Sequence, residues 1–239
     1  MSYVLEDSII QLEDEIQTRE DFVAAFAHEL KTPLTSIIGY ADALRSRRLD
    51  EEKQFMSANY IYTEGKRLEA MSFRLLDIMV TRRGEVEFTM VSAESLFLYL
   101  YDMYVINKSM KIYFNYDDGM VRAEANLIKS VLMNLLDNAF KASEADGLIE
   151  VYGHLMKDGY CFEVKDHGVG IPKEELHKIT KAFYMVDKSR SRSRNGAGLG
   201  LALCAEILEL HKSRLNIRSE LGKGTTMSFT LPLWKEDQL

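Results

Sequence analysis

The stretch VAAFAHELKTPLTSIIGYADAL, residues 23–44, decides the fold of the first part of the chain. Its apolar side chains recur at steps of three and four residues, and the same period extends back to Leu5 apart from one position, which Arg19 occupies. Such steps predict an amphipathic helix whose apolar seam packs in a coiled coil or a helical bundle. We therefore expect one long helix over residues 5–44. The seam consists of Leu5, Ile9, Leu12, Ile16, Val23, Phe26, Leu30, Leu34, Ile37, Ala41 and Leu44.

A second helix is expected after a polar, basic break at residues 45–50. Over residues 51–80, one helical face carries Ile61, Leu68, Met71, Leu75 and Ile78. A narrow hairpin of two helices cannot bury both of its apolar faces alone, whereas two hairpins paired in a four-helix bundle can. We therefore predict an all-α helical hairpin that dimerises, over residues 21–83. A coiled-coil linker over residues 1–20 would precede it.

The sequence pattern changes after residue 83 to a mixture of helices and strands. These elements predict an α+β sandwich, in which one sheet is covered by helices, over residues 84–239. The expected strands span residues 85–92, 111–116, 148–156 and 159–166, with a final hairpin at 214–233, and the expected helices span 93–107, 124–143, 172–183 and 199–211.

The composition excludes several classes of protein. A chain of 239 residues that is 46% hydrophobic and 28% charged, with three prolines, is globular. Its net charge of −7 argues against a nucleic-acid partner, because such proteins usually carry a basic face. Cys161 and Cys204 lie outside any CxxC pattern, which indicates a reducing cytoplasm and neither a disulfide framework nor a zinc site. No stretch reaches the roughly 18 apolar residues of a membrane span, so we expect a soluble protein or the soluble part of a membrane protein.

His28 is the first candidate for chemistry. At about 100° per residue it lies about 160° from the seam, with Thr32 one turn along the same face. Pro33 deprives the Glu29 carbonyl of its helical partner and should bend the helix beside the histidine. A carboxylate such as Glu29 at Nδ1–H would leave Nε2 of a neutral imidazole free to attack, and Thr32 could orient a water for hydrolysis of a phosphate ester. The alternative is an ordinary surface histidine.

Two later motifs suit a nucleotide and its metal ion. Asn134 and Asn138 lie four residues apart on one helix face, with Lys141 one turn on, and carboxamide and phosphate oxygens together suit Mg²⁺. The motif Asp166-His-Gly168-Val-Gly170 directly follows a predicted strand. Its glycines would let the backbone approach a flat ligand, while the Asp166 carboxylate could accept from an adenine amino group. The alternatives are a polar helix face for the first motif and a simple turn for the second.

A third motif, Gly196-Ala-Gly198-Leu199-Gly200-Leu201, opens a predicted helix. Backbone N–H groups at a helix N-terminus favour phosphate, although this motif lacks the lysine of a P-loop. Before it, Lys188, Arg190, Arg192 and Arg194 alternate with serines. This basic segment is either a flexible solvated loop or a lid that closes over polyphosphate charge.

The order of these motifs closely resembles the catalytic core of bacterial two-component sensor histidine kinases, over about residues 20–233. In that resemblance residues 28–34 look like the H box, 134–141 the N box, 166–170 the G1 box, Phe183-Tyr184 the F box and 196–201 the G2 box. It implies a HisKA-type dimerisation and phosphotransfer domain followed by an ATP-binding domain of the Bergerat fold, shared with gyrase, mismatch-repair and heat-shock-chaperone ATPases.

The resemblance also implies the roles of the residues around the histidine. His28 would accept phosphate from ATP and pass it to an aspartate on a separate response regulator, with Glu29 as its general base. Thr32 would support phosphatase activity toward that regulator. The protein would be a homodimer, and this chain would be the cytoplasmic portion of a longer, membrane-anchored sensor.

For the nucleotide, the resemblance implies that Asn138, with Asn134, holds Mg²⁺. Lys141 would contact phosphate and Asp166 would recognise adenine. The turn before this helix, Ala123-Glu124-Ala125, departs from the Gly-Asp pair of many relatives. The remaining nucleotide-binding positions would be Gly168, Gly170, Phe183, Tyr184, Lys188, Arg190, Gly196, Gly198, Leu199, Gly200, Leu201 and Thr225.

Two other functions compete with an autokinase. One is a Bergerat-fold ATPase with a conformational role, which leaves the predicted exposure of His28 and the Pro33 bend unexplained. The other is a nucleotide-binding scaffold without catalysis, which the intact phosphate-site residues disfavour.

Overall fold

The computed structural model describes residues 2–83, 86–106, 111–144, 147–186 and 198–235. The chain forms two compact units, and the division between them lies between Phe73 and Arg74. Within the described residues, no helix combines the length and the apolar character that a membrane span requires.

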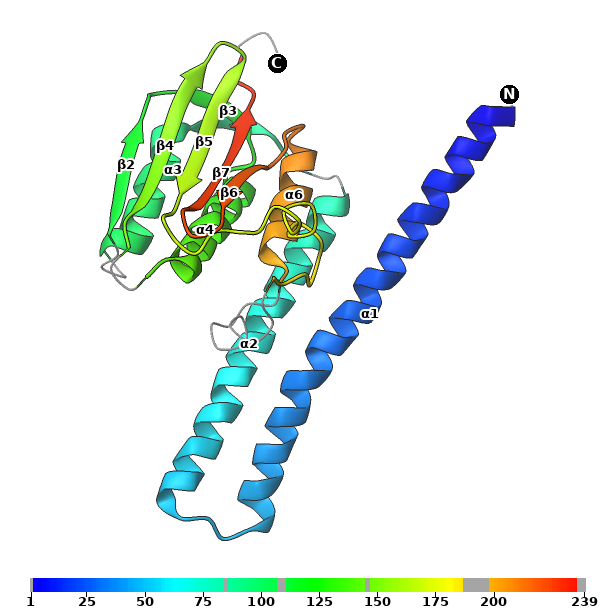
Figure 1. Ribbon diagram of the computed structural model, residues 1–239, viewed down its shortest axis with the longest axis vertical. Helices are drawn as coiled ribbons and strands as arrows, with labels where there is room; N and C mark the ends of the chain where they lie inside the picture. Colours follow the sequence, from blue (N-terminus) through cyan, green and yellow to red (C-terminus); the bar gives the residue numbers. More distant parts are fainter. Residues whose placement is uncertain (1, 84–85, 107–110, 145–146, 187–197, 236–239) are drawn as a thin grey trace. The chain divides into compact units, whose positions relative to one another are not determined.

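The first unit is a helical hairpin. Helix α1 spans Ser2–Ser46 and helix α2, which begins in this unit, spans Glu51–Arg83 (Figure 1). The carboxylate of Asp50 caps the start of α2, since Oδ1 accepts from the backbone N–H of Lys53 at 2.8 Å. Near the turn, the rings of Tyr40 and Tyr60 stack with centroids 4.7 Å apart. The two long helices predicted from the apolar period are confirmed.

The apolar stripe of α1 divides into a packed edge and an exposed edge. Pro33 is buried, and Phe26 and Ile37 are half-buried. By contrast, Val23 is 59% exposed and Ile38 is 63% exposed. The stripe is therefore wider than the surface that α2 covers.

The second unit is an α+β sandwich, as the sequence predicts. Its five-stranded sheet has the order β2-β4-β5-β7-β6, in which β2 and β4 run parallel and the other neighbours run antiparallel. The strands are β2 Ile112–Tyr116, β4 Ile149–Met156, β5 Gly159–Lys165, β6 Asn216–Glu220 and β7 Gly224–Leu231. The helices are α3 Ala93–Leu100, the π-helix η1 Tyr101–Ile106, α4 Ala125–Ala142 and α6 Gly200–Leu210.

Helix α4 packs on strands β4, β5 and β7 and is flanked by α3 and α6 (Figure 1). The core between helices and sheet is aromatic. Phe97 of α3 stacks on Phe162 of β5 with centroids 5.7 Å apart, and Phe162 stacks on Phe229 of β7 at 5.1 Å. All three rings are almost completely buried. This packing fixes α4, which carries the predicted N box, and the end of β5, which leads into the predicted G1 box.

A second, two-stranded sheet was not predicted. It pairs β1 Thr89–Ser92 with β3 Met120–Ala123 in antiparallel register. Strand β3 is four residues long, and the expected strand over residues 85–92 is reduced to its last four residues. Segments this short carry little alternation, so their pairing depends on a partner distant in the sequence.

The expected helix over residues 172–183 is wrong. The segment is a series of turns in which Glu175 N–H donates to the Pro172 carbonyl and Lys178 N–H to the Glu175 carbonyl, at 3.0 and 2.8 Å. A segment shorter than about 12 residues rarely forms a stable helix on its own, so its backbone conformation depends on how it packs against the rest of the domain. Here the side chain of Ile179 is buried in the hydrophobic core, and the segment packs on the domain through it as turns.

Candidate functional site

His28 lies on α1 and is exposed, as helical geometry predicts. Thr32 is also exposed, and its hydroxyl reaches the His28 carbonyl at 3.5 Å, which is the expected spacing of one turn. Pro33 lies inside α1 and is buried on the packed edge. Glu29 belongs to the same helix, but its side chain falls outside the described part of the structure. The side chains of His28 and Thr32 thus share an accessible face.

The residues of the predicted N box on α4 divide between two environments. Asn134 is buried, and its Nδ2 donates to the Ser130 carbonyl at 2.9 Å. Its Oδ1 faces the start of α6, where a Cβ on Gly200 would lie only 2.8 Å away. Asn138 and Lys141 are half-buried instead. Asn134 therefore sits between α4 and α6, whereas Asn138 and Lys141 are partly accessible.

Asp166, at the end of β5, is buried and held by backbone donors. Its Oδ1 accepts from Gly168 N–H at 2.8 Å and from Thr225 N–H at 3.2 Å. Burial raises the pKa of Asp166 above its ordinary value, and the two backbone hydrogen bonds oppose that rise. Among the described residues, both hydrogen bonds to this carboxylate end on its Oδ1. Its Oδ2 can therefore accept from an amino group of a ligand.

The glycines of this loop permit close contact with the chain itself. A Cβ on Gly168 would lie 2.2 Å from the carbonyl oxygen of Ala142, at the end of α4. Gly170 has φ +68, and a Cβ there would lie 2.1 Å from the carbonyl oxygen of Glu220. L side chains rarely adopt the conformation of Gly170, so that position requires glycine, while the clash with the Ala142 carbonyl requires glycine at residue 168. The loop is therefore fixed between the end of α4 and the turn from β6 to β7.

The structure also brings the predicted F box next to Gly198. Phe183 has φ +63, and its N–H donates to the Gly198 carbonyl at 2.9 Å. A Cβ on Gly198 would lie 2.7 Å from the carbonyl carbon of Phe183. The Tyr184 hydroxyl bonds the Glu175 carboxylate, and Lys178 Nζ lies 5.9 Å from the centroid of the Tyr184 ring.

The other predicted nucleotide positions are distributed as follows. Leu199 is fully buried at the start of α6, and Leu201 is half-buried in its first turn. Lys188, Arg190 and Gly196 lie outside the described residues.

Sequence reasoning missed a charged cluster beside Asp166. Glu150 Oε1 lies 2.6 Å from His167 Nε2 and 3.0 Å from Lys165 Nζ, while its other oxygen accepts from the Tyr152 hydroxyl. These hydrogen bonds lower the pKa of Glu150 to about 2 and raise that of Tyr152 to about 12. The alternation of side chains along the strands could have indicated this cluster. Glu150 and Tyr152 share one face of β4, and Lys165 is the cross-strand partner of Glu150.

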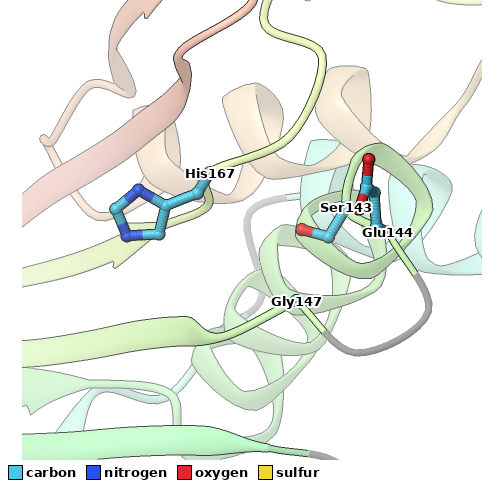
Figure 2. A pocket seen from close by; sticks show the side chains of 4 residues that line it. All are labelled: Ser143, Glu144, Gly147 and His167. Atoms are coloured by element: carbon cyan, nitrogen blue, oxygen red, sulfur yellow. The ribbon is translucent and has the colours of Figure 1, made fainter.

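A small pocket of about 220 Å³ adjoins this cluster. It is lined by Ser143, Glu144, Gly147 and His167. Figure 2 shows the imidazole of His167 on one side and Ser143 and Glu144 on the other. The pocket lies where the end of α4 meets the residue that follows Asp166. Within the described residues, no group of three or more His, Cys, Asp or Glu side chains could hold a metal ion.

Comparison with known proteins matches two domain families. Residues 18–79 match the His Kinase A (phospho-acceptor) domain, and residues 123–235 match the histidine kinase-, DNA gyrase B- and HSP90-like ATPase domain. The ATPase match covers α4, β4 to β7 and the loop of Asp166.

Relatives and solved structures agree with these matches. The chain is 31% identical to the sensor histidine kinase WalK of Bacillus subtilis, over 93% of this chain and 38% of WalK. It is 29% identical to the sensor histidine kinase YclK of the same organism, over 98% of this chain and 52% of YclK. The chain thus spans about half the length, or less, of these relatives.

A solved structure of histidine kinase ThkA in complex with response regulator protein TrrA has the same fold. The TM-score is 0.71 at 24% identity, over 94% of this chain and 66% of that one. The chain therefore carries a HisKA phosphoacceptor domain followed by a histidine kinase-, DNA gyrase B- and HSP90-like ATPase domain, and the relatives that it matches over nearly its whole length are sensor histidine kinases.

Proposed function

We propose that this protein transfers the γ-phosphate of ATP to Nε2 of its own His28 and then passes it to an aspartate of a response regulator. The observation that carries the proposal is the exposed His28, with Thr32 one turn away on the same face, in a chain that also has an ATPase domain. The domains would be a signalling linker over residues 1–20, a phosphotransfer domain over 21–83 and an ATP-binding domain over 84–239.

At His28 the chemistry needs a neutral imidazole with its lone pair on Nε2. The Glu29 carboxylate would accept the hydrogen bond from Nδ1–H and hold this tautomer. The Nε2 lone pair forms the new bond to the γ-phosphorus while the bond from phosphorus to the bridging oxygen breaks, and ADP leaves with that electron pair. The Nδ1 proton then moves to Glu29. Thr32 would orient a water when the regulator is dephosphorylated.

At the nucleotide end, the Asp166 carboxylate would accept from the adenine amino group. Burial and the fixed Oδ1 contacts make it a preorganised acceptor. The half-buried Lys141 would offset phosphate charge. Mg²⁺ would be held by the Asn138 carboxamide, with Asn134 behind it, together with phosphate oxygens. That ligand set fits an ion that prefers hard oxygen ligands and keeps few protein contacts.

The exposed edge of the hairpin supports a homodimer. Val23, Leu34 and Ile38 on α1 are 45–63% exposed. On α2, Phe55 is 74% exposed and Tyr62 is 66% exposed. An apolar surface of this kind on a narrow hairpin favours pairing with a second hairpin in a four-helix bundle.

The remaining partners follow from the family. ThkA was solved with a response regulator, and we infer that the exposed face of His28 and Thr32 binds such a receiver domain here. The relatives are named as sensor kinases and are longer than this chain. We place the chain in the cytoplasm as part of a membrane-anchored sensor.

Turnover measurements distinguish this function from its two rivals. An autokinase that relays phosphate through His28 should lose both phosphoprotein and regulator-dependent phosphate release in His28→Ala. Multiple-turnover phosphate release that is unaffected by His28→Ala would instead favour a Bergerat-fold ATPase with a conformational role. Calorimetric binding of ATP without any phosphoprotein would favour a nucleotide-binding scaffold.

A further inference from the structure

The π-helix η1 carries a buried tyrosine that touches the candidate nucleotide helix α4. Tyr104 is fully buried, and its ring stacks on Phe140 with centroids 5.7 Å apart and planes inclined by 15°. The hydroxyl oxygen of Tyr104 lies 2.8 Å from Asp137 Oδ1 and 3.2 Å from the Met133 carbonyl oxygen. Both acceptors belong to α4, so ring and hydroxyl together join η1 to that helix.

The backbone of η1 is unusual. It forms a π-helix over six residues directly after α3, and its wider turn shifts the phase of the side chains that follow Leu100. Such turns are rare and occur frequently at functional sites. A phenol has one proton to donate, and an ionised acceptor binds it more strongly than a carbonyl. The shorter contact, to Asp137, is therefore the stronger of the two.

Asp137 lies inside the motif to which we assign metal and phosphate binding. It directly precedes Asn138 and lies four residues before Lys141. Opposite charges at this spacing are neighbours on a helix surface. A carboxylate at residue 137 can therefore orient the ammonium that Lys141 carries on its four-carbon stem.

We propose that Tyr104 is a positioning residue for the nucleotide. Its hydroxyl holds the Asp137 carboxylate in one orientation, and that carboxylate directs the Lys141 ammonium toward the phosphates. This inference rests on the proposed function, because it assumes that ATP phosphates lie along α4. Without the hydroxyl, the carboxylate rotates and no longer directs the Lys141 ammonium toward the phosphates, which weakens ATP binding.

The test uses Tyr104→Phe in the full chain, because this variant keeps the stacked ring and removes the hydroxyl. We expect the KM for Mg-ATP in autophosphorylation to rise about fivefold, which corresponds to about 1 kcal/mol of binding, and kcat to change less than about twofold. Calorimetry with Mg-ATP should show the same weakening. Asp137→Asn should have a similar effect, and Tyr104→Phe should add nothing in the Asp137→Asn or Lys141→Ala background.

Tyr99→Phe is the matched control. The Tyr99 hydroxyl also reaches α4, but its partner there is Met133 Sδ, at 3.5 Å, and not Asp137. We expect it to leave the KM unchanged. A wild-type KM in Tyr104→Phe, an equal effect in Tyr99→Phe, or an effect that adds to that of Asp137→Asn would overturn the inference. If Tyr104→Phe does not fold, a wild-type KM in Asp137→Asn overturns it equally. Wild-type protein that takes up no phosphate from ATP would contradict the proposed function itself.

Discussion

His167 Nε2 lies 2.6 Å from Glu150 Oε1, which ties the residue after Asp166 to the neighbouring strand β4. The Glu150 side chain is only 14% exposed, and it is held by Lys165 and Tyr152 as well. The loop that carries the candidate adenine acceptor therefore rests on a hydrogen-bonded carboxylate on the outer face of the sheet.

We expect Glu150→Gln to lower the free energy of unfolding by about 1–3 kcal/mol at pH 7, because three donors lose a charged acceptor. The pKa of Glu150 falls from 4.5 to about 2 on folding. The stabilisation is thus complete above pH 4.5 and is lost as pH falls toward 2. Urea unfolding at several pH values measures this. Glu163→Gln on β5 is the control, and an equal effect of both variants would contradict the account.

Asp166→Asn should raise the stability of the fold while it weakens nucleotide binding. Burial raises the pKa of Asp166 above 3.8, so the folded state binds its proton more tightly than the unfolded state does. The charged carboxylate therefore destabilises the fold as pH rises above 3.8, most of all at neutral pH. The neutral amide keeps an oxygen for Gly168 N–H and Thr225 N–H.

For this variant we expect a higher melting temperature at pH 7.5 and an ATP dissociation constant raised at least about tenfold, as for loss of about 1.4 kcal/mol of binding. Scanning calorimetry and ATP titration measure the two effects. Asp158→Asn, in the exposed turn between β4 and β5, should change neither. Wild-type ATP affinity in Asp166→Asn would remove Asp166 from the nucleotide site.

His211 should make stability depend on pH near neutrality. It is buried at the end of α6, where Nδ1 donates to the Ile207 carbonyl at 2.7 Å and Nε2 accepts from Glu124 N–H at 3.1 Å. Burial lowers its pKa, so the unfolded chain takes up a proton at about pH 6.5 before the folded protein does. The contribution of His211 to the free energy of unfolding is therefore complete above pH 6.5, and it is lost as the pH falls below that value.

We therefore expect His211→Gln to lose about 1–2 kcal/mol of stability at pH 8, with a smaller loss at pH 5.5. Chemical unfolding at the two pH values measures the difference. His154→Gln, at an exposed position on β4, should show no such trend. A gap between wild type and His211→Gln that widens on acidification would contradict this assignment.

Ile38→Glu should weaken the dimer. Ile38 is 63% exposed on the edge of α1 that α2 leaves uncovered, and a charge buried in a four-helix core is strongly unfavourable. Sedimentation analysis should show a shift to monomer at micromolar concentration. Ser46→Glu, at the exposed end of α1, should remain dimeric. Monomeric wild-type protein would contradict the proposed bundle.

The sequence predicts most of this fold because the deciding signals are local. The period of α1, the amphipathic α4 and the hairpin of β4 and β5 each lie within one continuous stretch. The ribbon of β1 and β3 escapes prediction because Val91 pairs with Val121, thirty residues away in the chain. Neither strand is long enough to show an alternating pattern alone.

The candidate site also has parts that the sequence reveals and parts that depend on contacts between distant residues. Asp166 and its glycines are recognisable from a short motif, but the support of Asp166 by Thr225 N–H joins residues on different strands. Asn134 and Asn138 look equivalent at helical spacing, and only the packing of α6 against α4 turns Asn134 toward Gly200. Glu150 and His167 resemble ordinary hairpin residues until the fold brings them together.

The most direct test of the central claim is transfer of label from γ-labelled ATP to the purified protein in the presence of Mg²⁺. We predict an adduct that is labile in acid and stable in base, as a phosphorus–nitrogen bond requires, and that is absent in His28→Ala. Stable label on His28→Ala would contradict the assignment of His28 as the phosphoacceptor.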